Sequence, residues 1–263
     1  MSTTAIVVQA RAGGSRFPGK MLAPLLGQPL ILWTLQRLAA VYGPGAIIVA
    51  LPPGDAHAPL GAVCERHGYA VLQPAVPETD VLARYQAIAE EEGLDTIVRV
   101  TGDCPLIDPQ VVRGCLRAFE TGHYDHLGIA AEWPDGMDCE AFSRLALDVA
   151  DAEATDAADR EHVTPYLWRQ PQRFVCGTYP CPMDLTAYQW SVDTPGDLRL
   201  VEDLLKRVLR QAGVGFGWRD LWLALEESPG LKSRMLSRPP RNQAYVTQTG
   251  AASWETARYG GEA

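Results

Sequence analysis

Residues 5–20 read AIVVQARAGGSRFPGK, and the fold class follows from this stretch. An apolar, β-branched run typical of a buried strand leads directly into a loop with three glycines and three cations. Glycines let backbone N–H groups approach an anion closely, and Arg11, Arg16 and Lys20 supply positive charge. The composition predicts a loop that binds polyphosphate, and the alternative interpretation is a basic surface turn.

The distribution of charge points to the same loop. The first acidic residue is Asp55, so residues 1–54 carry a charge of +4, and the rest of a chain with net charge −9 carries −13. A positive segment in an acidic protein indicates a local anion site and argues against general affinity for nucleic acid.

A P-loop ATPase or regulatory nucleotide-binding module is the nearest competing hypothesis. Gly14, Gly19 and Lys20 satisfy the spacing G-x-x-x-x-G-K, but Met21 stands where that motif needs Ser or Thr for Mg²⁺. Two prolines and a glycine within residues 24–29 interrupt the helix that should follow. No G-x-G-x-x-G is present either, so neither nucleotide fingerprint fits.

Apolar runs alternate with helical patterns along the chain. Strands are expected at 5–9, 46–51, 69–72 and 96–101. Helices are expected at 29–42, 59–67, 79–92 and 109–121, the third capped by Thr79. Such alternation predicts an α/β fold with a doubly wound, mostly parallel, Rossmann-like sheet, in which ligands bind at the carboxyl ends of the strands.

Two further segments, 123–142 and 173–192, predict extra strands on an acceptor or dimer side. Thr194 is expected to cap a helix with Pro195 at its first position and Asp197 at its third. We therefore expect one domain over residues 1–228 with an insertion at about 123–192. A Pro-, Gly- and Ser-rich tail over 229–263 completes the chain, with disorder expected from residue 250 onward.

Composition limits the setting in which the protein acts. The 263 residues include no 18-residue apolar run, and the N-terminus has no secretory pattern. Six cysteines without a C-x-x-C motif predict free thiols in a reducing cytoplasm, although Cys176 and Cys181 could pair or bind metal. His123 and His126 are too sparse to indicate a zinc site.

The loop and its flanks, residues 9–20, resemble the signature of the CTP-dependent sugar cytidylyltransferases, close to A-R-x-x-S-[TK]-R-[LF]-P-G-K. This family includes the CMP-octulosonate and CMP-sialate synthetases, and the spore-coat polysaccharide biosynthesis protein F type is the most similar. Gly14 departs from the pattern, because Ser is common there. Similar motifs in the same order lie at residues 80–85, 102–107, 135–140, 160–166 and 190–195. The resemblance implies a nucleotidyltransferase fold over roughly residues 5–247.

Asp103 and Asp193 are the expected metal ligands. Each is predicted to follow a strand, which places both carboxylates at the sheet edge that carries the basic loop. Two carboxylates facing a triphosphate indicate Mg²⁺, for which Mn²⁺ can substitute. The alternative interpretation makes them a turn residue and the residue before a helix.

The resemblance implies that CMP passes from CTP to a sugar or sugar acid and that pyrophosphate leaves. The catalytic cations would be Arg11, Arg16 and Lys20. The nucleotide-binding residues would be Ala10, Gly13, Gly14, Ser15, Asp80 and Arg84. Asp80 and Arg84, four residues apart on a helix, are equally well interpreted as a surface ion pair.

The acceptor-binding candidates are Asp135, Asp138, Glu140, Arg160, His162 and Tyr166, since carboxylates often bind sugar hydroxyls. A solvated hairpin is the alternative for the acidic group. A transferase that uses another nucleotide or a non-sugar acceptor also fits, whereas a catalytically dead scaffold would not keep Lys20, Asp103 and Asp193. The expected partners are CTP, a small acceptor and a second copy of the chain, without nucleic acid or membrane.

Overall fold

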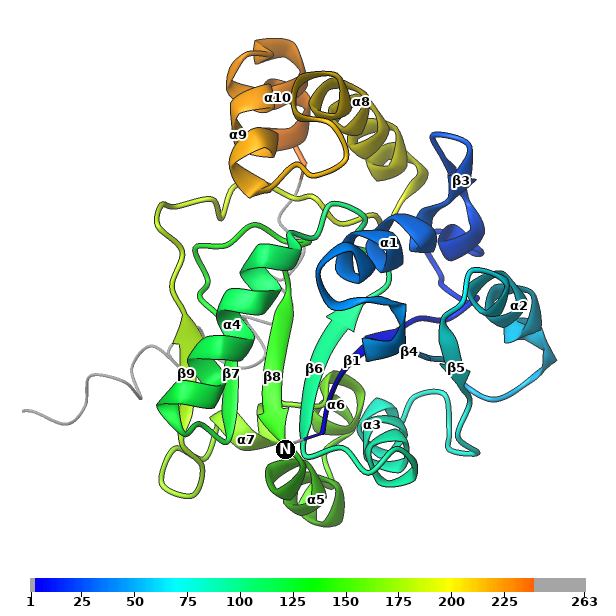
Figure 1. Ribbon diagram of the computed structural model, residues 1–263, viewed down its shortest axis with the longest axis vertical. Coiled ribbons are helices and arrows are strands. Elements are labelled where there is room, and N and C mark those ends of the chain that lie inside the picture. Colours follow the sequence, from blue (N-terminus) through cyan, green and yellow to red (C-terminus); the bar gives the residue numbers. More distant parts are fainter. Residues whose placement is uncertain (1–2, 239–263) are drawn as a thin grey trace, which may run out of the picture.

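A seven-stranded sheet with helices on both faces forms the centre of the protein (Figure 1). The computed structural model describes residues 3–238. The strand order is β5-β4-β1-β6-β8-β7-β9. In chain order, the strands of this sheet are β1 Thr4–Gln9, β4 Ile47–Ala50, β5 Ala70–Leu72, β6 Thr96–Thr101, β7 His126–Ile129, β8 Cys139–Ser143 and β9 Cys176–Tyr179.

The first half of the sheet is parallel and the second half is mixed. Strands β5, β4, β1 and β6 run parallel, β8 is antiparallel to both β6 and β7, and β7 pairs in parallel with β9. The chain leaves β1 toward β4 and β5 on one side and returns to β6 on the other. This reversal of direction opens a crevice at the carboxyl ends of β1 and β6, where open α/β sheets bind ligands.

The helices cover the sheet in two layers. One face carries α1 Leu30–Tyr42, α2 Ala58–Arg66 and α4 Pro109–Gly122, and the other carries α3 Val81–Glu91 and α5 Arg144–Glu153. Along β1, Ile6 and Val8 join the first core and Ala5 and Val7 join the second. Burial on both faces explains why this strand is apolar throughout rather than alternating.

The remaining elements are short or lie toward the C-terminus. They are η1 Lys20–Leu22, β2 Pro24–Leu25, β3 Gln28–Pro29, η2 Pro44–Ala46, η3 Asp55–His57, α6 Ala157–His162, α7 Pro165–Trp168, α8 Pro195–Ala212, α9 Trp218–Glu226 and α10 Pro229–Leu236. Figure 1 shows α8, α9 and α10 gathered at one end of the molecule. A 3-10 turn and a small hairpin follow the basic loop, in place of a P-loop helix.

The predicted fold class is confirmed, and the parallel strands lie within a residue or two of their predicted bounds. The cap of α3 was predicted wrongly. Asp80, not Thr79, precedes this helix, and its Oδ1 accepts a hydrogen bond from the Ala83 N–H at 3.0 Å. Asp80 caps the helix because its carboxylate oxygen reaches the free N–H groups of the first turn.

The segment before Asp193 also differs from its prediction. Residues 173–192 form only one strand, β9, and the chain reaches Asp193 through irregular structure. Two backbone bonds hold it, from Trp190 N–H to Asp135 O at 2.6 Å and from Val192 N–H to Asp103 O at 3.0 Å. Trp190 and Val192 are fully buried, so packing fixes this segment without a strand ladder.

The C-terminal end is folded further than residue 228. The cap of α8 is the predicted one, because Thr194 and Asp197 form a reciprocal capping box. Helix α10 packs against α8 and α9, and its Met235 is fully buried. The expected disorder from residue 250 onward lies outside the described residues. No helix within residues 3–238 is long and apolar enough to cross a membrane.

Candidate active site

The basic loop between β1 and η1 folds back on itself at the carboxyl end of β1. Gly19 N–H donates to Ala12 O at 3.0 Å, and Gly19 has a φ of 71°, which favours glycine. Arg37, the fourth cation of the N-terminal segment, does not contribute to the loop. It is buried and donates to the carbonyl oxygens of Ile107 and Phe216, both at 2.7 Å.

Lys20 lies between two carboxylates that are distant in sequence. Its Nζ donates to Asp103 Oδ2 at 2.6 Å, to Asp193 Oδ1 at 2.5 Å and to Val192 O at 3.0 Å. Arg16 binds the other oxygen of Asp193 at 2.8 Å. Burial opposes the charge on Lys20, but Asp103 and Asp193 outweigh burial and raise its pKa. The fold therefore brings Lys20, Asp103 and Asp193 together.

His57 and Glu78, which the sequence analysis did not name as site residues, also contact the basic loop. His57 is 4% exposed, and its Nδ1 accepts a hydrogen bond from the Ala12 N–H at 3.0 Å. Its Nε2 lies 3.9 Å from Glu78, whose other oxygen is 3.5 Å from Arg11. Arg84 donates to the Glu78 carbonyl at 2.8 Å and so holds the same turn. No motif marks His57, because its role comes only from the adjacency of β1 and β4.

Asp80 and Arg160 form an ion pair outside the cavity. The guanidinium of Arg160 donates twice to the Asp80 carboxylate, both at 2.9 Å, and once to Asp151 at 2.7 Å. This ties α3 to α6, and Asp80 pairs with Arg160 rather than with Arg84. Tyr166, also expected near the acceptor, hydrogen-bonds to Glu153 at the surface.

A cavity of about 1340 Å³ extends from the basic loop across β6 and β8 to β7 and β9. Most predicted site residues line it. They are Ala10, Arg11, Gly13, Gly14, Ser15, Arg16, Lys20, Arg84, Asp103, Asp135, Asp138, Glu140, His162 and Asp193. Asp80, Arg160 and Tyr166 are not among the lining residues. Helix α10 adds Met235 and Leu236 to the wall.

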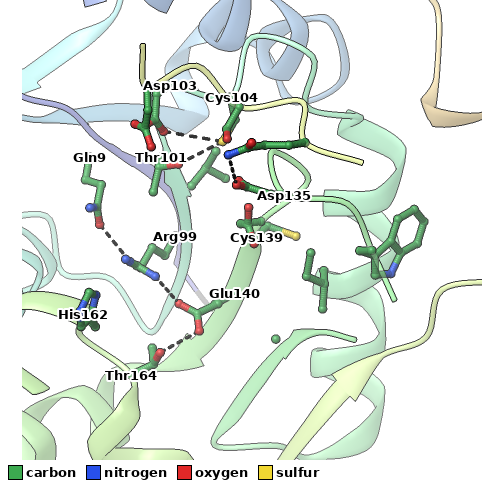
Figure 2. Close-up of a pocket in the computed structure, with 18 of the residues that line it drawn as sticks. Gln9, Arg99, Thr101, Asp103, Cys104, Asp135, Cys139, Glu140, His162 and Thr164 are labelled. Atoms are coloured by element: carbon green, nitrogen blue, oxygen red, sulfur yellow. Dashed lines mark hydrogen bonds and ion pairs between the residues drawn. The ribbon is translucent and has the colours of Figure 1, made fainter. Parts of the chain in front are cut away.

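A chain of polar side chains crosses the floor of the cavity (Figure 2). Gln9 accepts from Arg99 at 2.9 Å, Arg99 donates to Glu140 at 2.5 Å, and Glu140 also accepts from Thr164 at 2.7 Å. Burial alone would raise the pKa of Glu140, but Arg99 and His126 lower it to about 2. Arg99 and Glu140 face each other because they pair in the β6–β8 register.

Asp135 lies between this floor and Asp103 (Figure 2), and Asp138 lines the same cavity. Asp138 accepts from the Gly136 N–H at 2.8 Å, and Asp135 accepts from Gln189 at 3.0 Å. Burial, followed by the charges of Asp135 and Asp103, raises the pKa of Asp138 to about 7. Gly136 has a φ of 102°, and a Cβ there would lie 2.5 Å from the Ser191 nitrogen, so only glycine fits.

Asp103 and Asp193, the two expected metal ligands, are both ion-paired with Lys20. Within residues 3–238, no group of three or more His, Cys, Asp or Glu side chains is placed to hold one. All six cysteines are free thiols, including Cys176 and Cys181.

Cations on a glycine-rich loop at the topological switch point of an open α/β sheet form a place where the phosphates of a nucleotide can bind, which defines a nucleotide-binding class of protein. Comparison with known proteins gives the same class and a narrower family. Residues 5–213 match the family model described as cytidylyltransferase, and the chain belongs to this family. The resemblance found in the sequence is confirmed.

Individual relatives agree with this assignment. The chain is 28% identical over 214 residues to the spore coat polysaccharide biosynthesis protein SpsF of Bacillus subtilis, covering 79% of this chain and 88% of that protein. It is 38% identical over 124 residues to a 3-deoxy-manno-octulosonate cytidylyltransferase of an Anaeromyxobacter species, covering 46% of this chain and 49% of that protein.

Two solved structures share the fold. A cytidylyltransferase from Leptospira borgpetersenii superposes with a TM-score of 0.81 and 25% identity, covering 91% of this chain and 99% of that chain. A CMP:2-keto-3-deoxy-manno-octonic acid synthetase complexed with CTP gives a TM-score of 0.58 at 18% identity, covering 78% and 99%.

The His57–Ala12 hydrogen bond can be tested with two nearly isosteric variants. His57→Asn keeps an acceptor at the position of Nδ1, whereas His57→Gln places its amide near Nε2. We expect only the Gln variant to weaken the binding of inorganic triphosphate, by about 3- to 10-fold, because one hydrogen bond is worth about 1 kcal/mol. Calorimetry measures this, and equal affinity in both variants would contradict a positioning role for His57.

Proposed function

We propose that the protein transfers CMP from CTP to a sugar-type acceptor, with release of pyrophosphate, in the biosynthesis of a surface polysaccharide or glycoconjugate. The observation that carries the proposal is the contact of Lys20 with Asp103 and Asp193 in the wall of the cavity, in a member of the cytidylyltransferase family. Transfer from another nucleoside triphosphate is the second candidate, since the same loop would bind its phosphates.

The chemistry requires little beyond positioning and charge. An acceptor oxygen attacks the α-phosphorus of the nucleotide in line, and the bond to pyrophosphate breaks. Lys20 and Arg16 would hold the transferring phosphoryl group, and Arg11, half exposed at the loop, would hold the departing pyrophosphate. A preorganised contact of this kind contributes roughly 3–4 kcal/mol to the transition state.

We propose Mg²⁺ as the cofactor, with Mn²⁺ as a substitute, because Asp103 and Asp193, which face the basic loop, are suitable ligands for it. Lys20 Nζ touches both carboxylates within 2.6 Å, so Asp103 and Asp193 lie close enough to share one cation. Mg²⁺ is commonly held by one or two carboxylates together with substrate phosphates. When bound, the ion would polarise a phosphoryl oxygen and help to ionise the acceptor hydroxyl.

Asp138 is suited to receive the proton that the acceptor hydroxyl loses. Its carboxyl lines the same cavity as Asp103, and its pKa of about 7 matches that of a general base at neutral pH. We further propose a homodimer, on the family resemblance, and a cytoplasmic location, with which six free thiols are compatible.

The direct test of the function is pyrophosphate release from each of the four nucleoside triphosphates, with Mg²⁺ and a panel of sugar-type acceptors. We expect CTP to be consumed in preference. Thermal unfolding adds a second measurement, because a ligand at about 100 times its Kd stabilises the fold by roughly 2.7 kcal/mol. Equal effects of all four nucleotides would contradict cytidine selectivity, and protection by none would contradict nucleotide binding.

Asp103→Asn and Asp193→Asn should each abolish turnover while the fold stays intact. Asparagine keeps the size of the side chain and its hydrogen bonding but removes the charge that Mg²⁺ needs. Asp184→Asn, a change at an exposed carboxylate that does not line the cavity, is the matched control. Steady-state kinetics at saturating Mg²⁺ decides the matter, since near-normal kcat in either variant would remove that residue from the metal site.

The pH dependence of kcat/KM should report Asp138. The raised pKa means that the carboxylate form, which alone accepts a proton, accumulates as the pH rises through about 7. We therefore expect kcat/KM to climb through that region. Asp138→Asn should remove this limb of the profile and lower the rate about 10²- to 10⁴-fold. A profile that keeps its limb in the Asn variant would show that another group titrates.

A further inference from the structure

The guanidinium of Arg238, which follows α10, contacts the chain on both sides of Asp193. Its Nη1 donates to the Gln189 carbonyl at 2.8 Å, and its Nη2 lies 2.6 Å from Asp197 Oδ1. Gln189 lies four residues before Asp193, and Asp197 lies four residues after it. A single side chain therefore joins the two ends of the short stretch that carries Asp193 into the cavity wall.

Asp197 connects Arg238 to the backbone of Asp193. Its other carboxylate oxygen, Oδ2, accepts hydrogen bonds from the N–H groups of Asp193 at 2.9 Å and of Thr194 at 2.8 Å. The side chains of Asp197 and Arg238 are only 8% and 10% exposed. Loss of the guanidinium would leave a buried carboxylate without this counter-charge. The carboxylate would then shift toward water, and its hydrogen bond to the Asp193 N–H would weaken.

The stretch that Arg238 brackets is irregular, so its position depends on a few contacts. Two backbone hydrogen bonds, donated by Trp190 and Val192, join it to the rest of the cavity wall. Asp193 binds Lys20 with one carboxylate oxygen and Arg16 with the other. A displacement of the Asp193 backbone would therefore move a carboxylate that orients two cations of the basic loop.

Helix α10 brings Arg238 to this place. The helix packs against α8 and α9, with Met235 fully buried, and Figure 1 shows the three helices gathered at one end of the molecule. Met235, Leu236 and Arg238 all line the cavity. Because apolar packing fixes the end of α10, the guanidinium is held beside the stretch that contains Asp193 whenever this helix is docked.

From these contacts we infer that Arg238 is a positioning residue for Asp193, which makes the C-terminal helix α10 part of the active site. The inference rests on the proposed role of Asp193 as a metal ligand, and it adds a residue that lies outside every motif of the sequence. Arg238 acts through Asp197 and Gln189 rather than on a reacting atom. Its loss should weaken metal binding more than nucleotide binding, because the basic loop keeps its own cations.

The dissociation constant of Mn²⁺ reports the position of Asp193. Electron paramagnetic resonance of free Mn²⁺ measures it on the full chain saturated with a non-hydrolysable CTP analogue. Arg238→Met keeps an unbranched side chain and removes the guanidinium. We expect this variant to raise the Kd of Mn²⁺ about fivefold or more, which corresponds to the loss of one hydrogen bond. The affinity for the CTP analogue without metal should stay near that of the unchanged protein.

Arg234→Met is the matched control. Arg234 lies on the same helix and also pairs with α8, at 3.1 Å from Asp203, but its side chain is 57% exposed and is not among those that line the cavity. We expect this variant to bind Mn²⁺ as the unchanged protein does. An unchanged Kd in Arg238→Met would overturn the inference. An equal rise in Arg234→Met would overturn it too, since the cause would then be a loosened helix.

A double variant separates positioning from stability. Asp197→Asn combined with Arg238→Met leaves no unpaired buried charge and keeps an acceptor at the start of α8, so its thermal midpoint should recover relative to Arg238→Met. Its Mn²⁺ affinity should stay low, and full recovery of that affinity would overturn the positioning role. Binding of the CTP analogue and Mn²⁺ by the unchanged protein is recorded first. Failure there contradicts the proposed function, whereas a contrary result in the variants alone contradicts only the inference.

Discussion

The contact of one ammonium group with two carboxylates organises this molecule. Lys20 belongs to the loop after β1, Asp103 follows β6, and Asp193 precedes α8, yet the three meet within 2.6 Å. The sheet order makes the first pair inevitable, because β1 and β6 are neighbours and their carboxyl ends coincide. Asp193 is held in place by two backbone hydrogen bonds of the segment before it and by the burial of Trp190. This part of the cavity wall thus depends on packing on both sides of Lys20.

The cavity has two ends of opposite electrostatic character. Cations of the basic loop dominate one end, and buried oxygen acceptors dominate the other, with Asp103 between them. In the proposed reaction, the negative charges of the nucleotide would meet the cations of the basic loop.

Local patterns in the sequence predicted much of this arrangement, and long-range pairing supplied the rest. The strand before the basic loop, the alternation of helices and strands and the capping box at Thr194 depend on residues close in sequence, and these predictions were correct. His57 was not singled out, and His126 was considered only as a zinc ligand, because each matters only through a neighbour brought by the sheet. The interpretation of Asp80 as half of a pair with Arg84 was wrong for the same reason, since Arg160 is nearer in space.

The register between β6 and β8 has a consequence for how the sequence can vary. Arg99 and Glu140 form a partly buried ion pair at the junction between the parallel and the antiparallel parts of the sheet. Loss of one partner would leave the charge of the other without its main counter-charge, whereas loss of both partners leaves no such charge. The two positions are therefore expected to change together during evolution, and a relative with only one of the two would need a compensating charge nearby.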